Sequence, residues 1–432
     1  MKLNLLAIGF AAVLGSITLA LPLPAQAELQ IEIAKSFAEA PQIAIVPFES
    51  DTVLQPIIQA NLQRSGKFAS SANLPERPTR SQDLNLAAWQ SAGVPYVVVG
   101  QVRSNGSGYQ VQYELMDIQK NTRILGEQIN VPANRMREAG HLIADKIYEA
   151  LTGIPGDFSG RIAYVLRERK NGKPFFTLQI ADSDGQQPRT VLESVEPILS
   201  PTWTPDGRKI AYVSFETGRP AIYVQDLATG QRDTLAQFKG LNGAPSFSPD
   251  GKSMLFTASK DGNPEIYLME LSTKKIRRLT HDSAIDTEAR FAADGQSFVF
   301  TSDRGGTPQI YRYTLDSGQV RRLTFNGRFN ARGSLSSDGQ SLALVHRQSG
   351  QQYQVGVMDL ASGVISILTP TPLDESPSFS PNGQMVVYAT RERGRGMLAI
   401  MSTDGRFRMN LPSQSGEVRE PAWAPVIRSP AQ

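Results

Sequence analysis

The sequence predicts an all-β six-bladed β-propeller preceded by a small α/β domain, and the spacing of its turns predicts the larger part. Five Asp-Gly or Asn-Gly turns follow one another at intervals of 44 residues: Asp206-Gly207, Asp250-Gly251, Asp294-Gly295, Asp338-Gly339 and Asn382-Gly383. A large apolar residue precedes each turn, and Trp423 continues the same interval. A period of about 40–50 residues is typical of four-stranded propeller blades. The repeats therefore favour a binding protein.

The same series of strands recurs in each repeat. The Asp-Gly turn supplies the positive φ that a tight hairpin needs after a short first strand. Ile210–Val213 is an example of the second strand, Ile222–Val224 of the third, and Leu235 lies in a fourth. The second strands are apolar on both faces, as expected for strands packed between neighbouring blades.

Six blades follow from counting these strands. The first strand occurs six times, and so does the second, because Ile162–Val165 repeats Ile210–Val213. The earliest copy has no first strand before it, and the last copy has nothing after its first strand. The strand around Ala422–Ala424 is therefore expected to complete the blade that begins at Arg161, which removes the exposed edges of an open ring.

Residues 1–27 are interpreted as a cleaved signal peptide. Leu3–Leu23 is uncharged and mostly apolar, and Ala25-Gln26-Ala27 has the pattern of a cleavage site between Ala27 and Glu28. The alternative is a membrane anchor, which the short stretch and its following prolines disfavour. We therefore expect an exported periplasmic protein with no transmembrane segment. The chain has no cysteine, which excludes disulfides and thiolate metal sites.

Residues 40–155 are predicted to form the α/β domain, and residues 156–432 the propeller. Ile43–Phe48 and Pro95–Gly100 are expected to be buried strands, and Leu54–Arg64 a helix. A second helix over Asn134–Thr152 ends at a Gly-x-Pro sequence. His141 lies in this helix beside its apolar stripe, and we interpret it as a partly exposed structural residue.

The sequence carries no recognisable catalytic motif. The formal net charge is +3 without a long basic run, so nucleic acid is not an expected partner. No Gly-x-Ser-x-Gly elbow is present, and the three histidines, His141, His281 and His346, fit no zinc spacing. Two alternative functions remain. A periplasmic hydrolase or lyase would need a carboxylate or histidine with a strongly shifted pKa in the channel. A carbohydrate-binding propeller would need exposed aromatic residues on its loops, where Phe329 is the clearest example.

Several segments resemble the TolB family, the periplasmic propeller proteins of the Tol–Pal envelope system. Ser200–Val213 and Gly243–Gly251 resemble the family's repeat, and Asn61–Phe68 and Leu151–Ile154 resemble its N-terminal domain. The resemblance covers nearly all of the mature chain. It implies a monomeric, non-enzymatic adaptor that links inner-membrane Tol proteins to the peptidoglycan-associated lipoprotein Pal. The implied roles are outer-membrane integrity and invagination during cell division.

The resemblance also implies that residues 28–39 bind TolA. Apolar and polar residues alternate at the start of this segment, in Glu28, Leu29, Gln30, Ile31, Glu32 and Ile33. Such alternation suits a strand that is added to the sheet of a partner, and no strand inside the chain is an obvious partner. The alternative is a chain terminus without a role.

Pal is implied to bind one face of the propeller, which group B colicins also exploit. We expect this face to be built from the loops that lead into the first strand of each blade. Its candidate residues are Leu241, Asn242, Ala244, Asp286, Thr287, Glu288, Asn330, Asp374, Glu375 and Ser376. The four acidic residues among them are expected to make the rim acidic. The family is sometimes associated with a divalent cation in the central channel, for which the sequence identifies no ligands; no other cofactor is expected.

Overall fold

The computed structural model describes residues 31–32, 40–350, 352–371, 373–411 and 416–425. The predicted signal peptide and its cleavage site at Ala27 and Glu28 lie outside these residues, as do Leu29, Gln30 and Ile33. Among the described residues, none of the helices has the length and apolar character needed to cross a bilayer.

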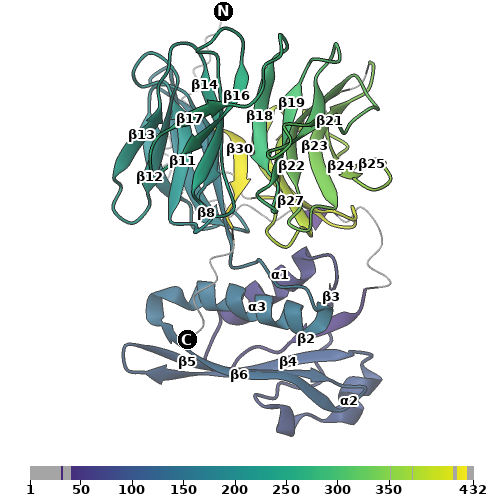
Figure 1. Cartoon of the computed structure of the whole chain (residues 1–432). Helices are drawn as coiled ribbons and strands as arrows, with labels where there is room; N and C mark the ends of the chain where they lie inside the picture. Colours follow the sequence, from purple (N-terminus) through teal and green to yellow (C-terminus); the bar gives the residue numbers. More distant parts are fainter. Residues whose placement is uncertain (1–30, 33–39, 351, 372, 412–415, 426–432) are drawn as a thin grey trace, which may run out of the picture.

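The N-terminal domain is a five-stranded sheet with helices on both faces. The strand order is β3-β2-β4-β5-β6, with β2 (Gln42–Ile45), β3 (Ala69–Ser70), β4 (Tyr96–Asn105), β5 (Gly108–Asp117) and β6 (Thr122–Pro132). The helices are α1 (Leu54–Arg64), α2 (Leu86–Ser91) and α3 (Met136–Thr152), with short 3-10 turns at Ser81–Asp83 and Ala133–Arg135. Helices α1 and α3 lie between this sheet and the propeller (Figure 1).

Local sequence explains where these helices begin and end. Asp51 Oδ2 accepts hydrogen bonds from the backbone N–H groups of Val53 and Leu54, at 2.9 and 2.7 Å, and so caps the start of α1. Gly153 follows α3 with φ of +73°, the left-handed conformation that glycine adopts most readily at a helix end. The helices predicted over Leu54–Arg64 and Asn134–Thr152 are both present.

The described part of the propeller consists of six antiparallel sheets, as the sequence predicts. Blade 1 contains β10 (Ile198–Trp203), β11 (Lys209–Ser214), β12 (Ala221–Asp226) and β13 (Arg232–Ala236). Blade 2 contains β14 (Asn242–Phe247), β15 (Ser253–Ala258), β16 (Glu265–Glu270) and β17 (Ile276–Arg278). Blade 3 contains β18 (Asp286–Phe291), β19 (Ser297–Ser302), β20 (Gln309–Thr314) and β21 (Val320–Arg322).

The remaining blades have the same order of strands, with one addition. Blade 4 contains β22 (Phe329–Leu335), β23 (Ser341–Arg347), β24 (Gln354–Asp359) and β25 (Ile365–Ile367). Blade 5 contains β26 (Glu375–Phe379), β27 (Met385–Glu392), β28 (Arg395–Ser402) and β29 (Arg408–Asn410), to which β1 (Ile31–Glu32) is added. Blade 6 contains β30 (Glu417–Trp423), β7 (Arg161–Lys170), β8 (Lys173–Asp182) and β9 (Arg189–Ser194).

The repeated turn is held by its own side chains. In blade 2, Asp250 Oδ1 accepts from the backbone N–H of Lys252 at 3.0 Å and from Ser248 Oγ at 2.6 Å. Gly251 has φ of +70°, which a residue with a Cβ adopts only at a cost. The Asp-Gly pair therefore reverses the chain between the first and second strands.

Blade 6 closes the ring, as predicted. The C-terminal strand β30 pairs with β7, with Ala422 opposite Ala163 and Trp423 opposite Ile162. The backbone N–H of Ala424 donates to the carbonyl oxygen of Arg161 at 2.8 Å. Strands from the two ends of the propeller sequence thus form one sheet, with β30 near the centre of the ring (Figure 1).

The predicted lack of a partner for residues 28–39 inside the chain is wrong. Strand β1 pairs antiparallel with β29, with Ile31 opposite Met409 and Glu32 opposite Arg408. Strand β29 is the outermost strand of blade 5, and an outermost strand has backbone hydrogen-bonding groups free to accept another strand. Ile31 and Glu32 occupy that edge.

The two domains are joined by an ion-pair cluster at the turn between β8 and β9. Arg137 of α3 donates from Nε to Asp182 Oδ2 at 2.9 Å and also pairs with Asp184. Arg64 of α1 donates to Ser183 Oγ at 2.9 Å. Helices α1 and α3 therefore both contact the same propeller turn.

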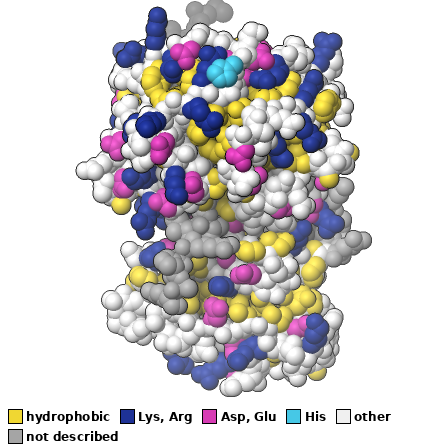
Figure 2. All heavy atoms as spheres, in the orientation of Figure 1, with side chains coloured by type: hydrophobic (Ala, Val, Ile, Leu, Met, Phe, Trp, Pro, Cys, Tyr) yellow, Lys and Arg dark blue, Asp and Glu magenta, His cyan; other side chains and the backbone are white. Residues whose placement is uncertain are grey.

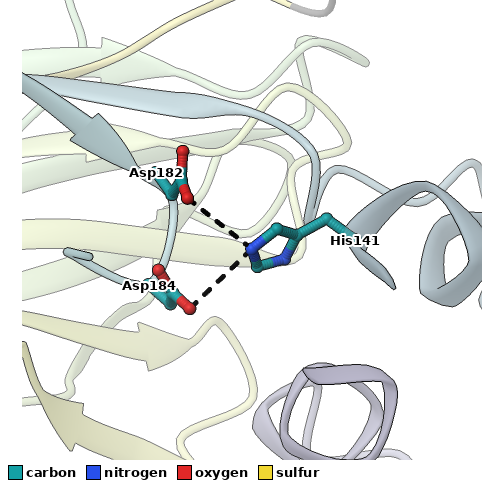
Figure 3. A group of neighbouring side chains, drawn as sticks. All are labelled: His141, Asp182 and Asp184. Atoms are coloured by element: carbon teal, nitrogen blue, oxygen red, sulfur yellow. Dashed lines mark ion pairs between the residues drawn. The ribbon is translucent and has the colours of Figure 1, made fainter. Parts of the chain in front are cut away.

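His141 lies at the centre of this cluster (Figure 3). Its Nδ1 is 2.8 Å from Asn61 Nδ2, and its Nε2 is 3.9 Å from an oxygen of both Asp182 and Asp184. The residue is 2% exposed, so the expectation of partial exposure is wrong, because the propeller turn covers this side of α3. Burial lowers the pKa of His141 to about 3.

We predict that removing residues 423–432 abolishes the cooperative thermal unfolding of the protein. The deletion leaves Glu417–Ala422 able to pair with β7 but removes the pairing of Trp423 with Ile162, the buried indole and the hydrogen bond from Ala424 to Arg161, so that the inner end of the closing sheet is lost. Trp423→Ala is the matched control, because it keeps the backbone pairing and should lower the melting temperature while leaving one transition. A cooperative transition of the truncated protein close to that of the wild type would contradict this account of closure.

We also predict that His141 makes stability fall as pH is lowered from 6.5 toward 3. An unfolded histidine takes up its proton near pH 6.5 and the folded one near pH 3, so the unfolded state binds more protons between these values. The loss is up to about 1.4 kcal/mol for each pH unit. Denaturant unfolding of wild type and His141→Asn from pH 7 to pH 4 provides the measurement.

The difference between the two proteins isolates the histidine. Burial raises the pKa of Asp157 to about 6, so this carboxyl favours folding as pH falls from 6 toward 3.8. Because both proteins contain Asp157, its contribution cancels in the difference. The stability advantage of the wild type should shrink as pH is lowered, and a constant difference would contradict the prediction.

Candidate protein-binding face

The loops leading into the inner strands lie at the end of the propeller away from the N-terminal domain. The opposite end faces that domain, since Asn382 in the β26–β27 turn donates to the carbonyl oxygen of Pro155 at 3.0 Å. Lys67 likewise pairs with Asp404 of the β28–β29 turn at 3.3 Å. We call the distant end the loop face.

A bulge near the start of every inner strand shapes the channel mouth. Six residues 44 positions apart have left-handed backbones, with φ between 47° and 58°: Ser200, Ala244, Glu288, Arg332, Ser376 and Glu420. The strand register shifts at the same places, as expected where one strand contains an extra residue. All six line a channel cavity of about 450 Å³, and we call them the channel ring.

The charged members of the channel ring pair with one another. Arg332 Nε is 3.1 Å from Glu288 Oε1, and Arg332 Nη2 is 3.8 Å from Glu420 Oε1. Arg332 also donates from Nη1 to Ser376 Oγ. The channel mouth is therefore a mixed-charge ring, and the expected acidic rim is wrong for Glu288, whose charge is balanced by Arg332.

Two predicted face residues are buried asparagines that hold the loops in place. Asn242 accepts from the backbone N–H of Phe238 at 2.9 Å and donates to its carbonyl oxygen at 2.8 Å. Asn330 donates to the carbonyl oxygen of Asn326 at 2.7 Å, and its Oδ1 is 2.8 Å from His346 Nδ1. Both side chains are fully buried, so they act on the face through the loops.

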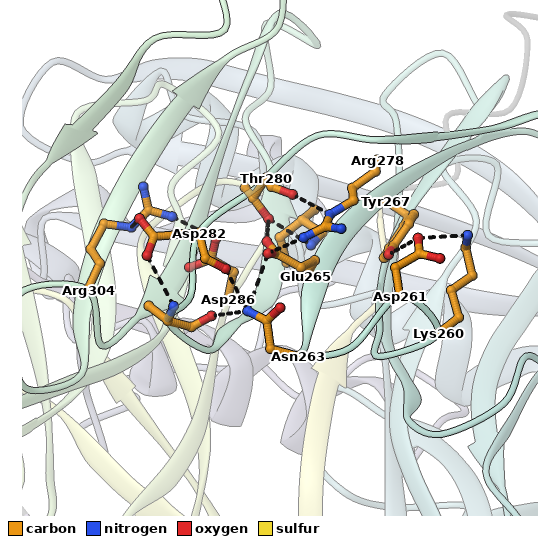
Figure 4. Close-up of polar contacts among 12 residues, drawn as sticks. Lys260, Asp261, Asn263, Glu265, Tyr267, Arg278, Thr280, Asp282, Asp286 and Arg304 are labelled. Carbon is orange, nitrogen blue, oxygen red and sulfur yellow. Dashed lines mark hydrogen bonds and ion pairs between the residues drawn. The ribbon is translucent and has the colours of Figure 1, made fainter.

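Asp286 and Asp374 occupy the equivalent positions and are also fully buried. Arg304 donates to Asp286 Oδ2 at 2.6 Å (Figure 4), and Thr390 donates to Asp374 Oδ1 at 2.6 Å. Burial raises the pKa of both carboxyls. The expectation that they contribute to an acidic rim is wrong, because the pattern of repeats does not reveal which way each side chain points.

A polar network supports the loop before β18. Asn263 donates to the carbonyl oxygens of Asp282 and Ala284, each at 2.7 Å (Figure 4). The buried Glu265 accepts from Arg278 at 2.6 Å. These contacts satisfy backbone groups of an irregular segment, so the loop has a defined shape.

Exposed apolar side chains gather on the loop face. Phe325 is 72% exposed, Ile285 49% and Leu241 39%, and Val195 and Leu199 are also exposed there. Hydrophobic and basic side chains alternate over much of the upper propeller in Figure 2. Sequence reasoning missed Ile285, although its position 44 residues after Leu241 could have revealed it. Clusters of this kind are typical of protein-binding surfaces.

A groove of about 400 Å³ opens between blades 3, 4 and 5, which we call the apolar groove. Its apolar residues are Ile285, Pro308, Phe329, Ala331, Val345, Tyr353 and Leu373, and the rings of Phe329 and Tyr353 pack edge to face at 5.0 Å. The predicted residues Thr287, Glu288, Asp374 and Glu375 line it as well. The predicted binding residues therefore lie in three places. These four lie at the groove, while Ala244, Glu288 and Ser376 belong to the channel ring, and Leu241 is exposed on its loop.

One group of residues has the composition of a metal site. Among the described residues, ligand atoms of His141, Asp182 and Asp184 lie within 4.8 Å of one another. Arg137 already pairs with both carboxylates, and Arg64 lies beside them. A cation at this position would face two guanidinium groups, so the cluster fits a domain interface better than a metal centre.

The geometry defines a two-domain propeller protein whose loops form a candidate binding face. Matches to family models identify it further: the TolB amino-terminal domain matches residues 29–124, and the TolB beta propeller domain matches residues 148–427. The chain belongs to the TolB family. This family is periplasmic, and the chain is a component of the Tol–Pal system.

Individual relatives agree with this assignment. The Tol-Pal system protein TolB of Acinetobacter baylyi is 72% identical over 402 residues, 92% of this chain and 94% of that protein. The protein of the same name from Thioalkalivibrio sulfidiphilus is 58% identical over 418 residues, 94% of this chain and 96% of that protein. The crystal structure of TolB from Acinetobacter baumannii superposes with a TM-score of 0.86 at 64% identity, covering 92% of this chain and 100% of that chain.

Proposed function

We propose that this protein is a non-enzymatic adaptor linking the inner-membrane Tol proteins to the lipoprotein Pal in the periplasm. The signal peptide is removed before Glu28, and the mature protein acts as a monomer in outer-membrane integrity and in invagination during cell division. The observation that carries the proposal is the loop face, where the loops between blades carry exposed apolar side chains and the apolar groove opens.

The loop face is the proposed binding site for Pal, and for group B colicins where they use this protein. Ile285 and Phe325 offer apolar area, and Thr287 and Glu375 supply polar groups at the edge of the groove. Glu375 forms no ion pair with a described residue, so it is available to a basic or amide-rich partner. Such a contact weakens as salt concentration rises.

The perturbed groups favour an adaptor over a hydrolase or lyase. The shifted pKa values of His141 and Asp157 belong to residues at the domain interface, and the raised pKa of Asp374 at the groove belongs to a buried carboxyl that accepts from Thr390. In the described channel, the carboxylates of Glu288 and Glu420 are engaged by Arg332 and by backbone or hydroxyl donors. Phe329 and Tyr353 pack against each other in the groove, an arrangement that supports a protein ligand more than a stacked sugar.

We predict that Ala244→Arg and Thr287→Arg each weaken Pal binding by about 2 kcal/mol or more, through steric clash in a packed interface. Ala244 lies in the channel ring and Thr287 in the apolar groove, so the pair samples two parts of the loop face. Isothermal titration of the folded variants against Pal provides the measurement.

Ala228→Arg is the matched control, because Ala228 is exposed in the β12–β13 turn at the other end of the propeller. It should bind Pal as the wild type does. If both loop-face variants bind Pal with wild-type affinity, the assignment of Pal to this face is wrong.

We also propose that residues 28–39 bind TolA by adding a strand to its sheet. In the structure, Ile31 and Glu32 pair with β29. Because β1 is the outermost strand of that sheet and pairs with β29 along one edge, a strand of TolA would be added along its other edge.

Deletion of residues 28–39 is expected to abolish TolA capture while changing the melting temperature by only a few degrees. Of the residues that the structure describes in this segment, Ile31 and Glu32 pair with β29, and the core of blade 5 lies on β26 to β29. Capture of TolA from a purified mixture, together with thermal unfolding, tests both parts. TolA capture by the deletion variant at the wild-type level would refute the assignment, and Pal binding by the same variant is the control for correct folding.

A further inference from the structure

Two layers of side chains line the channel below the loop face. The channel ring forms the first, and the residues two positions further along each inner strand form the second: Thr202, Ser246, Arg290, Ser334, Ser378 and Ala422. All of these except Ser246 line the channel cavity. The second layer therefore combines one guanidinium with hydroxyl groups and contains no carboxylate.

Arg290 has unused hydrogen-bonding capacity. Within the described chain, Arg290 donates one hydrogen bond, from Nη1 to Thr202 Oγ1 at 3.3 Å, and it forms no ion pair within 4.0 Å, since Glu288 and Glu420 act on it only over a longer distance. A guanidinium carries five N–H donors. Since Arg290 lines the cavity, its other donors are available to a ligand there.

The acceptors of the channel ring, by contrast, are largely used. Glu288 Oε2 accepts from Thr301 Oγ1 at 3.0 Å and from the backbone N–H of Arg332 at 3.2 Å. Glu420 Oε2 accepts from the backbone N–H of Ser200 at 2.5 Å. The other oxygen of each carboxylate faces the Arg332 guanidinium.

These residues do not fit the divalent cation that the family resemblance suggests for the channel. Calcium and magnesium need several oxygen ligands around the ion, and carboxylates supply most of the charge. A cation that reached Glu288 or Glu420 would stand next to Arg332, and one in the second layer would face Arg290. The positive groups therefore oppose a cation at both levels.

We propose instead that the channel binds an oxyanion, a phosphate or carboxylate group, at Arg290. The planar fork of a guanidinium matches two oxygens of such a group, and charge-assisted hydrogen bonds of this kind are strong. Hydroxyl groups of the same layer add donors: Ser378 Oγ accepts from the backbone N–H of Trp423 at 3.1 Å and donates to no described residue, so its proton can be donated to a ligand. Thr202 and Ser334 line the same cavity.

Isothermal titration of the full mature protein with inorganic phosphate, and separately with malonate, tests the proposal at low chloride concentration. Saturable binding of at least one probe is expected, and comparison of the two separates phosphate from carboxylate recognition. Arg290→Gln removes the charge and should weaken binding about tenfold or more. Arg277→Gln is the control, because Arg277 is exposed on β17 and should leave binding unchanged.

Binding of neither probe would overturn the proposal, as would equal affinity in Arg290→Gln. If Arg290→Gln does not fold, Ser334→Ala gives the second test, with a several-fold loss expected and an unchanged affinity contradicting the site. Calcium titration adds an opposite test: saturable calcium binding that Glu420→Gln abolishes would show a cation site. Pal binding is measured on the same samples, so a failure here is distinguishable from a failure of the adaptor proposal.

Discussion

The pairing of β30 with β7 is the interaction on which the rest of the propeller depends. It joins strands separated by about the whole length of the propeller sequence into one sheet, so neither end of the ring presents an unpaired inner edge. Once the ring is closed, each blade packs between two neighbours through strands that are buried on both faces. The position of every loop around the axis follows from this closure.

Because the ring is regular, residues 44 positions apart in the sequence lie at equivalent places on successive blades and together form one surface. The left-handed residue at the start of each inner strand costs roughly 1–2 kcal/mol for a side chain with a Cβ, and it persists in all six blades because the surrounding strand pairs fix it. Just before it, buried residues such as Asn242 and Asp286 hold the loops, and the residues before those, Leu241 and Ile285, remain exposed. In each of these short segments, a buried residue that holds the loop thus lies next to an exposed residue that can contact a partner.

The contacts at the domain interface could not be predicted from the local sequence. The helix containing His141 was predictable from its apolar spacing, but the histidine itself is buried by a turn more than 40 residues away, which brings Asp182 and Asp184 to its ring. In the same way, β1 has the alternating pattern of a strand without a visible partner, and its partner β29 lies near the other end of the chain. Neither contact leaves a signal in the neighbouring residues.

The sequence by itself determined the number of blades, the closing strand and the gathering of the loops at one end of the ring, because these follow from the repeated order of strands and its interval of 44 residues. It also determined the two main helices, whose periodicity and terminal residues are local properties. Only the tertiary structure decided which acidic residues are buried, how Arg332 balances Glu288 and Glu420, and that Arg290 lines the channel without an ion pair to any described carboxylate. The physical reason is that the charge and burial of one residue depend on side chains from neighbouring blades. The repeat interval determines the positions of those blades in the ring but does not determine which side chains they have.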